Sequence, residues 1–189
     1  MSRSVATLRL PDALYLLALM WAIQLAQTLL GFELGIYGIV PRTVEGLWHI
    51  PLAPWVHHGV LHLVSNSVPF LLLGWLVQSK GRVLFWEVTF LLVVVGGLGT
   101  WAFGSTAYHA GASGVVLGYW AYLLADSYYS RTLKNIIIAT VVIFLFGGLI
   151  ISLVDIRPHI SWIGHVTGMG AGVLVAWLAN RSARSTTPQ

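Results

Sequence analysis

Long apolar runs alternate with short polar breaks along this chain, and the pattern predicts its architecture. Six runs are long enough to cross a bilayer, since a spanning helix needs about 20 largely apolar residues. They cover approximately residues 12–31, 60–78, 86–103, 113–129, 135–154 and 163–180. A spanning barrel would instead repeat alternating segments of about ten residues. We therefore predict an all-α polytopic membrane protein, a six-transmembrane-helix bundle that forms a single domain over residues 1–189.

The composition agrees with a membrane environment. Hydrophobic residues make up 57% of the chain and charged residues only 8%, whereas a soluble domain carries roughly 25% charged residues. The net charge of +4 comes from basic residues scattered in ones and twos, so we expect the lipid bilayer, and no nucleic acid, as a partner. The first run is too long for the apolar core of a signal peptide, which predicts a retained helix.

The basic residues predict an orientation. With a cytoplasmic N-terminus, Arg42 and Arg157 lie outside and the other eight Lys and Arg residues lie in the cytoplasm. This bias follows the positive-inside rule, and six spans return the C-terminus to the cytoplasm. All seven histidines then fall in the outer half or the outer loops. We expect a multi-pass protein of the cell membrane whose chemistry faces outward.

Three polar residues on three predicted spans lie at a similar depth. Counted from the inner end of each span at a rise of about 1.5 Å per residue, Asn66, Ser113 and His165 lie roughly 20–24 Å above the inner boundary. That level is inside a hydrocarbon core of about 30 Å. An unpaired buried polar group costs on the order of 2–7 kcal/mol. The three side chains are therefore expected to meet.

Ser113 and His165 together make a nucleophile and a general base, because an imidazole can take a hydroxyl proton near neutral pH. The carboxylates predicted for the outer loops, Glu33, Glu45 and Asp155, have no evident route to His165. The pattern thus favours a Ser–His dyad over a triad.

His62 and Asn66 lie four residues apart, so they share one face of a helix. With the main-chain N–H of Ser113, their neutral donors form a candidate oxyanion hole. The small residues Gly111 and Gly114 let the backbone turn tightly beside the serine. A metal site is the competitor for the histidines, but His57 and His62 are five apart and no acidic residue is near them in sequence. We predict no metal and no cofactor.

Three motifs in this order resemble the rhomboid family of intramembrane serine proteases: HHGVLHLVSN on the second span, GASG on the fourth and GHVTGMGAG on the sixth. The likeness covers nearly the whole chain. It implies that Ser113 is the nucleophile and His165 the base. His62, Asn66 and the amides of Ser113 and Ala112 would form the oxyanion hole.

The resemblance implies supporting roles as well. His57 would support the site rather than take part in the chemistry, and Gly168 and Gly172 would let the sixth span pack closely on the fourth. The implied activity is cleavage of single-pass transmembrane proteins near the outer membrane face. Leu117 stands where some members have an aromatic residue, and Arg42 is separated from Trp48 where some have an adjacent Trp–Arg pair.

Other interpretations remain open on the sequence. Each small-residue motif taken singly also fits a plain helix contact, His165 a buried histidine, and Asn66 an interhelical hydrogen bond. His109 and the remaining histidines read as polar loop residues. A catalytically silent rhomboid-like protein that binds membrane clients is the main alternative function. A small-solute channel or transporter would favour inverted repeats, and the two halves show none. The substrate and the oligomeric state are not predicted.

Overall fold

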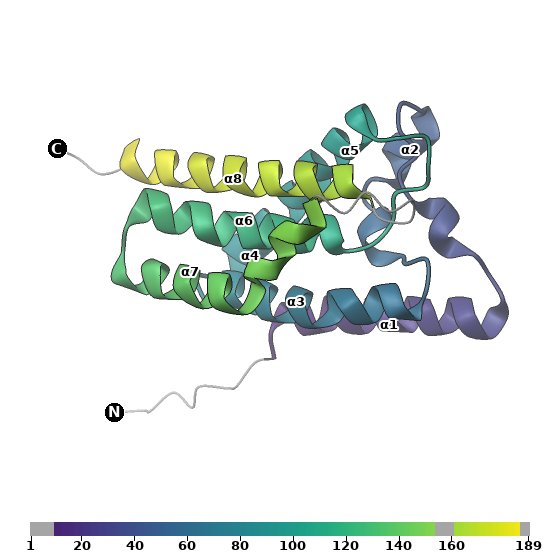
Figure 1. Ribbon diagram of the computed structural model, residues 1–189, viewed down its shortest axis with the longest axis horizontal. Coiled ribbons are helices and arrows are strands. Elements are labelled where there is room, and N and C mark those ends of the chain that lie inside the picture. The colour runs from purple at the N-terminus through teal and green to yellow at the C-terminus, as the bar shows by residue number, and fades with distance from the viewer. Residues whose placement is uncertain (1–9, 154–160, 186–189) are drawn as a thin grey trace.

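The computed structural model describes residues 10–153 and 161–185. Its longer helices are α1 (Asp12–Leu30), α3 (Val60–Gln78), α4 (Arg82–Leu91), α5 (Gly97–Phe103), α6 (Ser113–Ser130), α7 (Leu133–Phe146) and α8 (Trp162–Ser185). Short elements are α2 (Val44–His49), the 3₁₀ turns η1 (Leu34–Tyr37), η2 (Ala53–Trp55) and η4 (Gly147–Leu153), and the π-helical turn η3 (Leu92–Gly96). Most of the long helices run along one axis (Figure 1). The described residues contain no strand, and the predicted all-α polytopic bundle is confirmed.

All six predicted spans correspond to helices, and three differ at their boundaries. The helix of the sixth, α8, continues five residues past the predicted end, to Ser185. The third begins earlier than predicted, at Arg82, whose Nε donates to the Asp12 carboxylate at 2.6 Å. The fifth begins after Thr132, whose side chain caps the first turn, and its α-helix ends at Phe146. The pair Gly147–Gly148 weakens the α-helix there, and the chain continues as η4.

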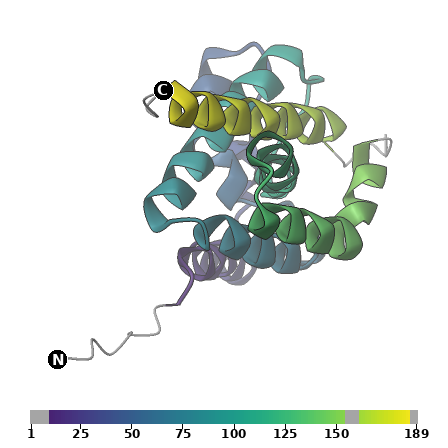
Figure 2. The same cartoon turned by 90° about the vertical axis from the view of Figure 1, so that its left-hand side faces the viewer.

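The predicted fourth span, α6, differs from the other spans in its surroundings. Within the described residues, five segments are long and apolar enough to cross a membrane: α1, α3, Arg82–Phe103, Leu133–Ser152 and Trp162–Arg181. Helix α6 is not among them, yet it lies at the middle of the bundle (Figure 2), packed against α3, α7, α8 and η3. Eleven of its 18 residues are buried. Because protein covers α6, its sequence need not be uniformly apolar.

Helices α6 and α8 touch through their backbones. A Cβ atom added to Gly168 would lie 2.1 Å from the carbonyl oxygen of Gly114, and one added to Gly172 would lie 2.2 Å from that of Gly118. Any side chain at these positions would force the helices apart. The predicted close packing of the sixth span on the fourth is confirmed, and it brings together the two ends that carry Ser113 and His165.

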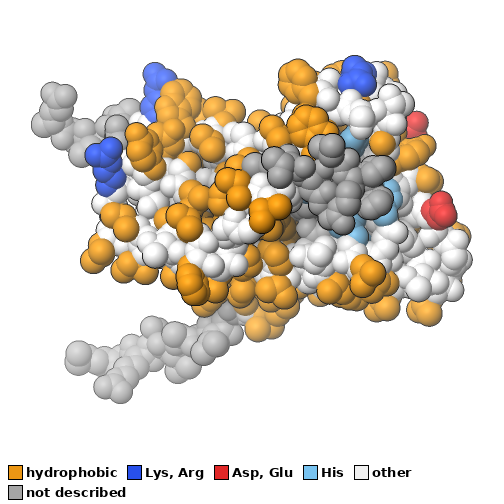
Figure 3. Space-filling model, viewed as in Figure 1, with side chains coloured by type: hydrophobic (Ala, Val, Ile, Leu, Met, Phe, Trp, Pro, Cys, Tyr) orange, Lys and Arg blue, Asp and Glu red, His pale blue; other side chains and the backbone are white. Residues whose placement is uncertain are grey.

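The two ends of the bundle differ in charge. At one end, the Asp126 carboxylate accepts hydrogen bonds from Lys80 (2.7 Å), Asn135 (2.9 Å) and Asn180 (2.8 Å), which links α6, α7 and α8 to the chain after α3. Histidine and acidic side chains gather at the other end, beside α2 (Figure 3). Among the described residues, Arg42 is a basic residue of that end, and its guanidinium donates to the carbonyl oxygen of Gly104 at 2.8 Å.

Candidate active site

The structure brings Ser113 and His165 into hydrogen-bond contact. Ser113 is the first residue of α6 and His165 lies in the first turn of α8. The distance from Ser113 Oγ to His165 Nε2 is 3.0 Å. The imidazole is largely buried, at 7% exposure, while Ser113 is half-buried. This contact is the geometry that a nucleophile and its general base require.

The second nitrogen of His165 determines which proton the ring carries. His165 Nδ1 lies 3.1 Å from the main-chain oxygen of Ser152 in η4. A carbonyl oxygen can only accept a hydrogen bond, so Nδ1 carries the proton in this arrangement. Nε2 is then the unprotonated nitrogen, which can accept the Ser113 hydroxyl proton. A backbone carbonyl thus fills the orienting role that a carboxylate has in a catalytic triad.

The loop before Ser113 is held in an unusual conformation. Gly111 has a φ of +114°, and a Cβ atom there would lie 2.5 Å from the His62 ring. Its N–H donates to the carbonyl oxygen of Ala53 at 2.9 Å. Both the dihedral angle and the closeness of His62 require glycine here. As a result, the His62 ring lies against the backbone two residues before Ser113.

His57 also contacts this loop. Its ring is almost fully buried, and its Nε2 accepts the Ala112 N–H at 3.3 Å. Burial, and then the neighbouring His62 and His58, lower the pKa of His57 to about 3. The ring therefore stays neutral at physiological pH, which is the form that can accept this hydrogen bond. The structure thus gives the Ala112 amide a partner other than the predicted oxyanion.

His62 and Asn66 lie on one face of α3, as predicted. The Asn66 side chain is buried and donates to the carbonyl oxygen of His62 at 2.9 Å. The His62 ring contacts His57 edge-on, with the ring centroids 5.1 Å apart. Ser113, as the first residue of α6, has an amide N–H that the helix itself cannot satisfy. Two of the predicted oxyanion donors, His62 and the Ser113 amide, therefore lie beside the loop that ends at Ser113.

A small cavity adjoins the serine. It has a volume of about 50 Å³ and is lined by Ser113, Thr100, His109 and Ser161 together with apolar side chains and glycines. A water molecule needs roughly 10–15 Å³ of such space and two or more polar partners. The cavity therefore has room for water, or for a small side chain, next to the nucleophile. Among the described residues, no group of three or more His, Asp or Glu side chains could hold a metal ion.

Sequence reasoning missed several residues near the site. Ser152 contributes only its backbone carbonyl to the site, and a backbone contact cannot be predicted from a pattern of side chains. His109 was interpreted as a polar loop residue, but it is buried and bonded to Ser161. Trp101 anchors the loop that contains Thr43, because its indole N–H donates to the carbonyl oxygen of Thr43 at 2.7 Å. Asp155 and His159 lie outside the described residues.

These features define a class first: a multi-pass helical membrane protein with a Ser–His pair at the start of two tightly packed helices. Comparison with protein families then identifies the family within that class. The model of the Rhomboid domain matches residues 44–182, which is well over half of the chain. The chain belongs to the rhomboid family, and the resemblance recognised in its sequence is confirmed.

Individual relatives agree with this assignment. An uncharacterized protein of Mycobacterium tuberculosis is 35% identical over 176 residues, which cover 88% of this chain and 73% of the relative. An uncharacterized protein of Mycobacterium leprae is 33% identical over 180 residues, covering 90% and 71%. The mitochondrial RHOMBOID-like protein 6 of Arabidopsis thaliana is 23% identical over 140 residues, covering 72% and 46%.

Proposed function

We propose that this protein is an intramembrane serine endopeptidase that works through a Ser113–His165 dyad. The observation that carries the proposal is the 3.0 Å contact between Ser113 Oγ and His165 Nε2. The hydrogen bond from His165 Nδ1 to the Ser152 carbonyl supports it, because it leaves Nε2 unprotonated. Membership of the rhomboid family supports it further.

The reaction proceeds through an acyl-enzyme. Ser113 Oγ attacks the carbonyl carbon of the scissile peptide bond while its proton moves to His165 Nε2. The resulting oxyanion accepts hydrogen bonds from the Ser113 N–H, His62 and Asn66. When the intermediate collapses, the C–N bond breaks and His165 gives the proton to the leaving amine. Water then attacks the ester, His165 takes the water proton, and Ser113 recovers its hydroxyl.

The substrates in this proposal are single-pass transmembrane proteins. A helix hides its own carbonyl groups, so the cleaved segment must unwind locally before Ser113 can reach it. Residues of low helix propensity near the cleavage point favour that step. The small cavity beside Ser113 would suit a small side chain at the cleaved position.

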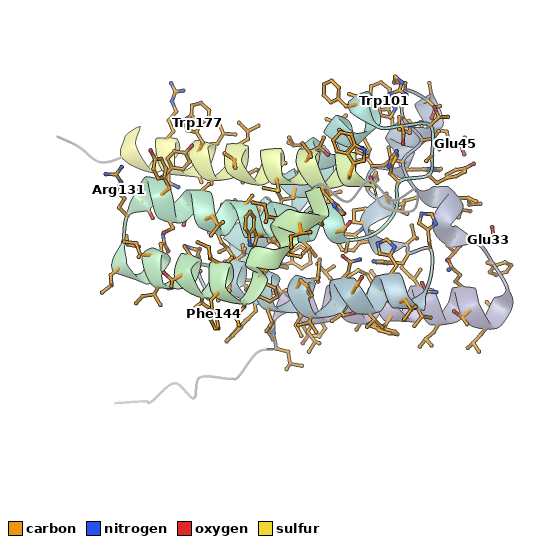
Figure 4. The ribbon with its side chains drawn as sticks, viewed as in Figure 1. Glu33, Glu45, Trp101, Arg131, Phe144 and Trp177 are labelled. Carbon is orange, nitrogen blue, oxygen red and sulfur yellow. The ribbon has the colours of Figure 1, made fainter. Side chains whose placement is uncertain are left out.

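The proposed orientation has both termini in the cytoplasm and the dyad near the outer face of the cell membrane. Its support is the charge difference between the two ends of the bundle. In Figure 4, Arg131 lies at the end opposite to Glu33 and Glu45. Lys80, Lys134 and the last turns of α8 are at the Arg131 end, and the positive-inside rule assigns that end to the cytoplasm.

Cleavage of a transmembrane reporter by purified protein in detergent tests the proposal. Ser113→Ala and His165→Ala should each abolish cleavage, with a loss of at least about 10³-fold, because each removes a group that takes part in bond making. Both variants should keep the unfolding temperature of the wild type within a few degrees. A fluorophosphonate probe should label the wild type at Ser113 and should not label Ser113→Ala.

The same experiment separates the alternative functions. A silent client-binding protein would hold the reporter without cutting it and would leave Ser113 unlabelled. Cleavage that persists in Ser113→Ala would remove the dyad from the mechanism. The close Ser–His contact disfavours the silent alternative, because that function needs no general base beside the serine.

A further inference from the structure

A second buried histidine, His109, lies four residues before Ser113 in the same loop. Its ring is 7% exposed and bonds on both sides. His109 Nε2 is 2.9 Å from the carbonyl oxygen of Ser105, so Nε2 must donate. Nδ1 is then the acceptor, and it lies 2.7 Å from Ser161 Oγ. The hydroxyl of Ser161 therefore donates a hydrogen bond to His109.

Ser161 is the residue immediately before α8 and caps its first turn. Its Oγ accepts the N–H of Gly164 at 3.2 Å, and its carbonyl oxygen accepts the N–H of His165 at 3.1 Å. The Gly164 bond satisfies one of the four amides that the first turn of a helix leaves open, and the His165 bond is the first hydrogen bond within the helix. Because the Ser161 proton points to His109, a lone pair of Oγ is directed to Gly164. His109 thus determines how the cap of α8 is oriented.

His109 is itself fixed to the outer loops. Its main-chain N–H and carbonyl oxygen pair with Ile39 at 2.9 and 2.8 Å in an isolated antiparallel bridge. Burial lowers the pKa of His109, so the ring stays neutral and can accept the hydrogen bond from Ser161. A rigid link therefore runs from the loop that carries Ser113, through His109 and Ser161, to the turn that carries His165.

We propose that His109 is a positioning residue that acts through Ser161 to hold His165 at the distance and angle needed by Ser113. This inference rests on the proposed peptidase function. A displacement of about 1 Å at a reacting group can lower the rate about 10²-fold, which makes such a link matter for catalysis.

The test compares His109→Phe, Ser161→Ala and the double variant with the wild type. Each single change should lower kcat of reporter cleavage and the rate of fluorophosphonate labelling of Ser113 by about 10- to 100-fold, with KM unchanged. The double variant should match the weaker single variant within about threefold, because both changes break one link. Ser161→Thr keeps a hydroxyl and should restore most of the rate.

A structural measurement and a control accompany the rates. Amide exchange at Gly164 and His165 should be faster in both single variants, and exchange in α6 should be unchanged. His49→Phe serves as the control, because His49 is also buried at the outer end but bonds to the carbonyl oxygen of Gly38 instead of to α8. It should leave kcat and the exchange of α8 close to those of the wild type.

The outcomes distinguish this inference from the proposed function. Multiplied losses in the double variant, a rise in KM alone, or normal exchange at the start of α8 would each overturn the role of His109 while the wild type still cleaves. A wild type that neither cleaves nor reacts with the probe would overturn the peptidase and the positioning role together.

Discussion

Two pairs of elements in this bundle pack in opposite ways. Helices α6 and α8 meet through glycines, with a backbone oxygen where a side chain would stand. Helix α7 and the turn η4 contact the bundle through bulky apolar side chains, and only two of the 14 residues of α7 are buried, against eleven of 18 in α6. Backbone contact allows few alternative positions, whereas apolar side chains against lipid allow many.

The difference indicates a division of labour. The rigid pair holds Ser113 and His165 at a fixed distance. The loosely packed segment is tied at its start, where Asn135 bonds to Asp126 and Ser130, and its far end reaches His165 through the Ser152 carbonyl. Loosely packed elements are where gating motions are usually found. We therefore expect α7 and η4 to move as a gate for membrane substrates while α6 and α8 stay in place.

The largest effect beyond the dyad is expected at the donors on α3, which complete the rigid half. His62→Ala and Asn66→Ala should each lower kcat by about 10- to 1,000-fold, in the range of one lost oxyanion donor. KM should barely change, because the hydrogen bond matters chiefly in the transition state. Steady-state kinetics on the reporter measure both constants. A change in KM alone would reassign that residue to substrate binding.

The backbone contact itself is tested by Gly168→Ala. The added methyl group would meet the Gly114 carbonyl, so α8 must move away from α6. A shift of that size at a reacting group should lower kcat about 100-fold, and overpacking should destabilise the fold by about 1–3 kcal/mol.

Gly170→Ala is the matched control on the same helix, because nothing lies within 4 Å of the atom it adds. It should keep wild-type activity and a wild-type unfolding temperature, or a slightly higher one. Equal losses in the two variants would mean that helix propensity, and not the α6–α8 contact, is being measured.

The gate is tested with two phenylalanines of α7 that differ in burial. Phe146 packs against the buried core, whereas Phe144 is 86% exposed and points away from the bundle (Figure 4). Phe146→Ala should raise turnover of a transmembrane substrate by about two- to tenfold, since removing it loosens the gate. Phe144→Ala should leave turnover unchanged.

A short soluble peptide that reaches Ser113 from water provides the second comparison. Its cleavage should gain much less from Phe146→Ala than cleavage of the transmembrane substrate does. Equal acceleration of both substrates would argue against lateral entry, and an unchanged rate for both would remove the gate from the mechanism.

The smallest effect at neutral pH is expected from the titration of His57, which changes stability only under acidic conditions. The pKa of His57 is about 3 in the folded protein and 6.5 in the unfolded chain, so between these values the unfolded chain binds a proton that the folded protein excludes. The titration of His57 therefore leaves the free energy of unfolding unchanged above pH 6.5 and lowers it progressively as the pH falls toward 3. The unfolding temperature of the wild type in detergent should fall over this interval.

His57→Phe should flatten that decline, because the titrating group is gone. His58→Phe removes the adjacent, exposed histidine and should keep the wild-type decline of unfolding temperature with pH. A slope that is the same in all three proteins would show that groups other than His57 carry the pH dependence.

The spans could be predicted from the sequence because the bilayer imposes a length and an apolar composition on each of them. The Ser113–His165 contact followed for a related reason, because polar side chains at one depth in hydrocarbon must find partners. Asn66, which was expected to meet them, bonds instead to the carbonyl oxygen of His62 in its own helix. The glycines of α8 were likewise predictable, since small residues four apart let two helices touch.

The tertiary structure decided what depends on backbone position and on side-chain direction. The Ser152 carbonyl beside His165 has no signature in side-chain pattern, and the link from His109 to Ser161 joins residues 52 positions apart. Phe144 and Phe146 are chemically identical, and only the packing of α7 distinguishes them. The bilayer selects residue types by depth alone, so it determines which helices form, whereas contacts between those helices determine how each residue acts.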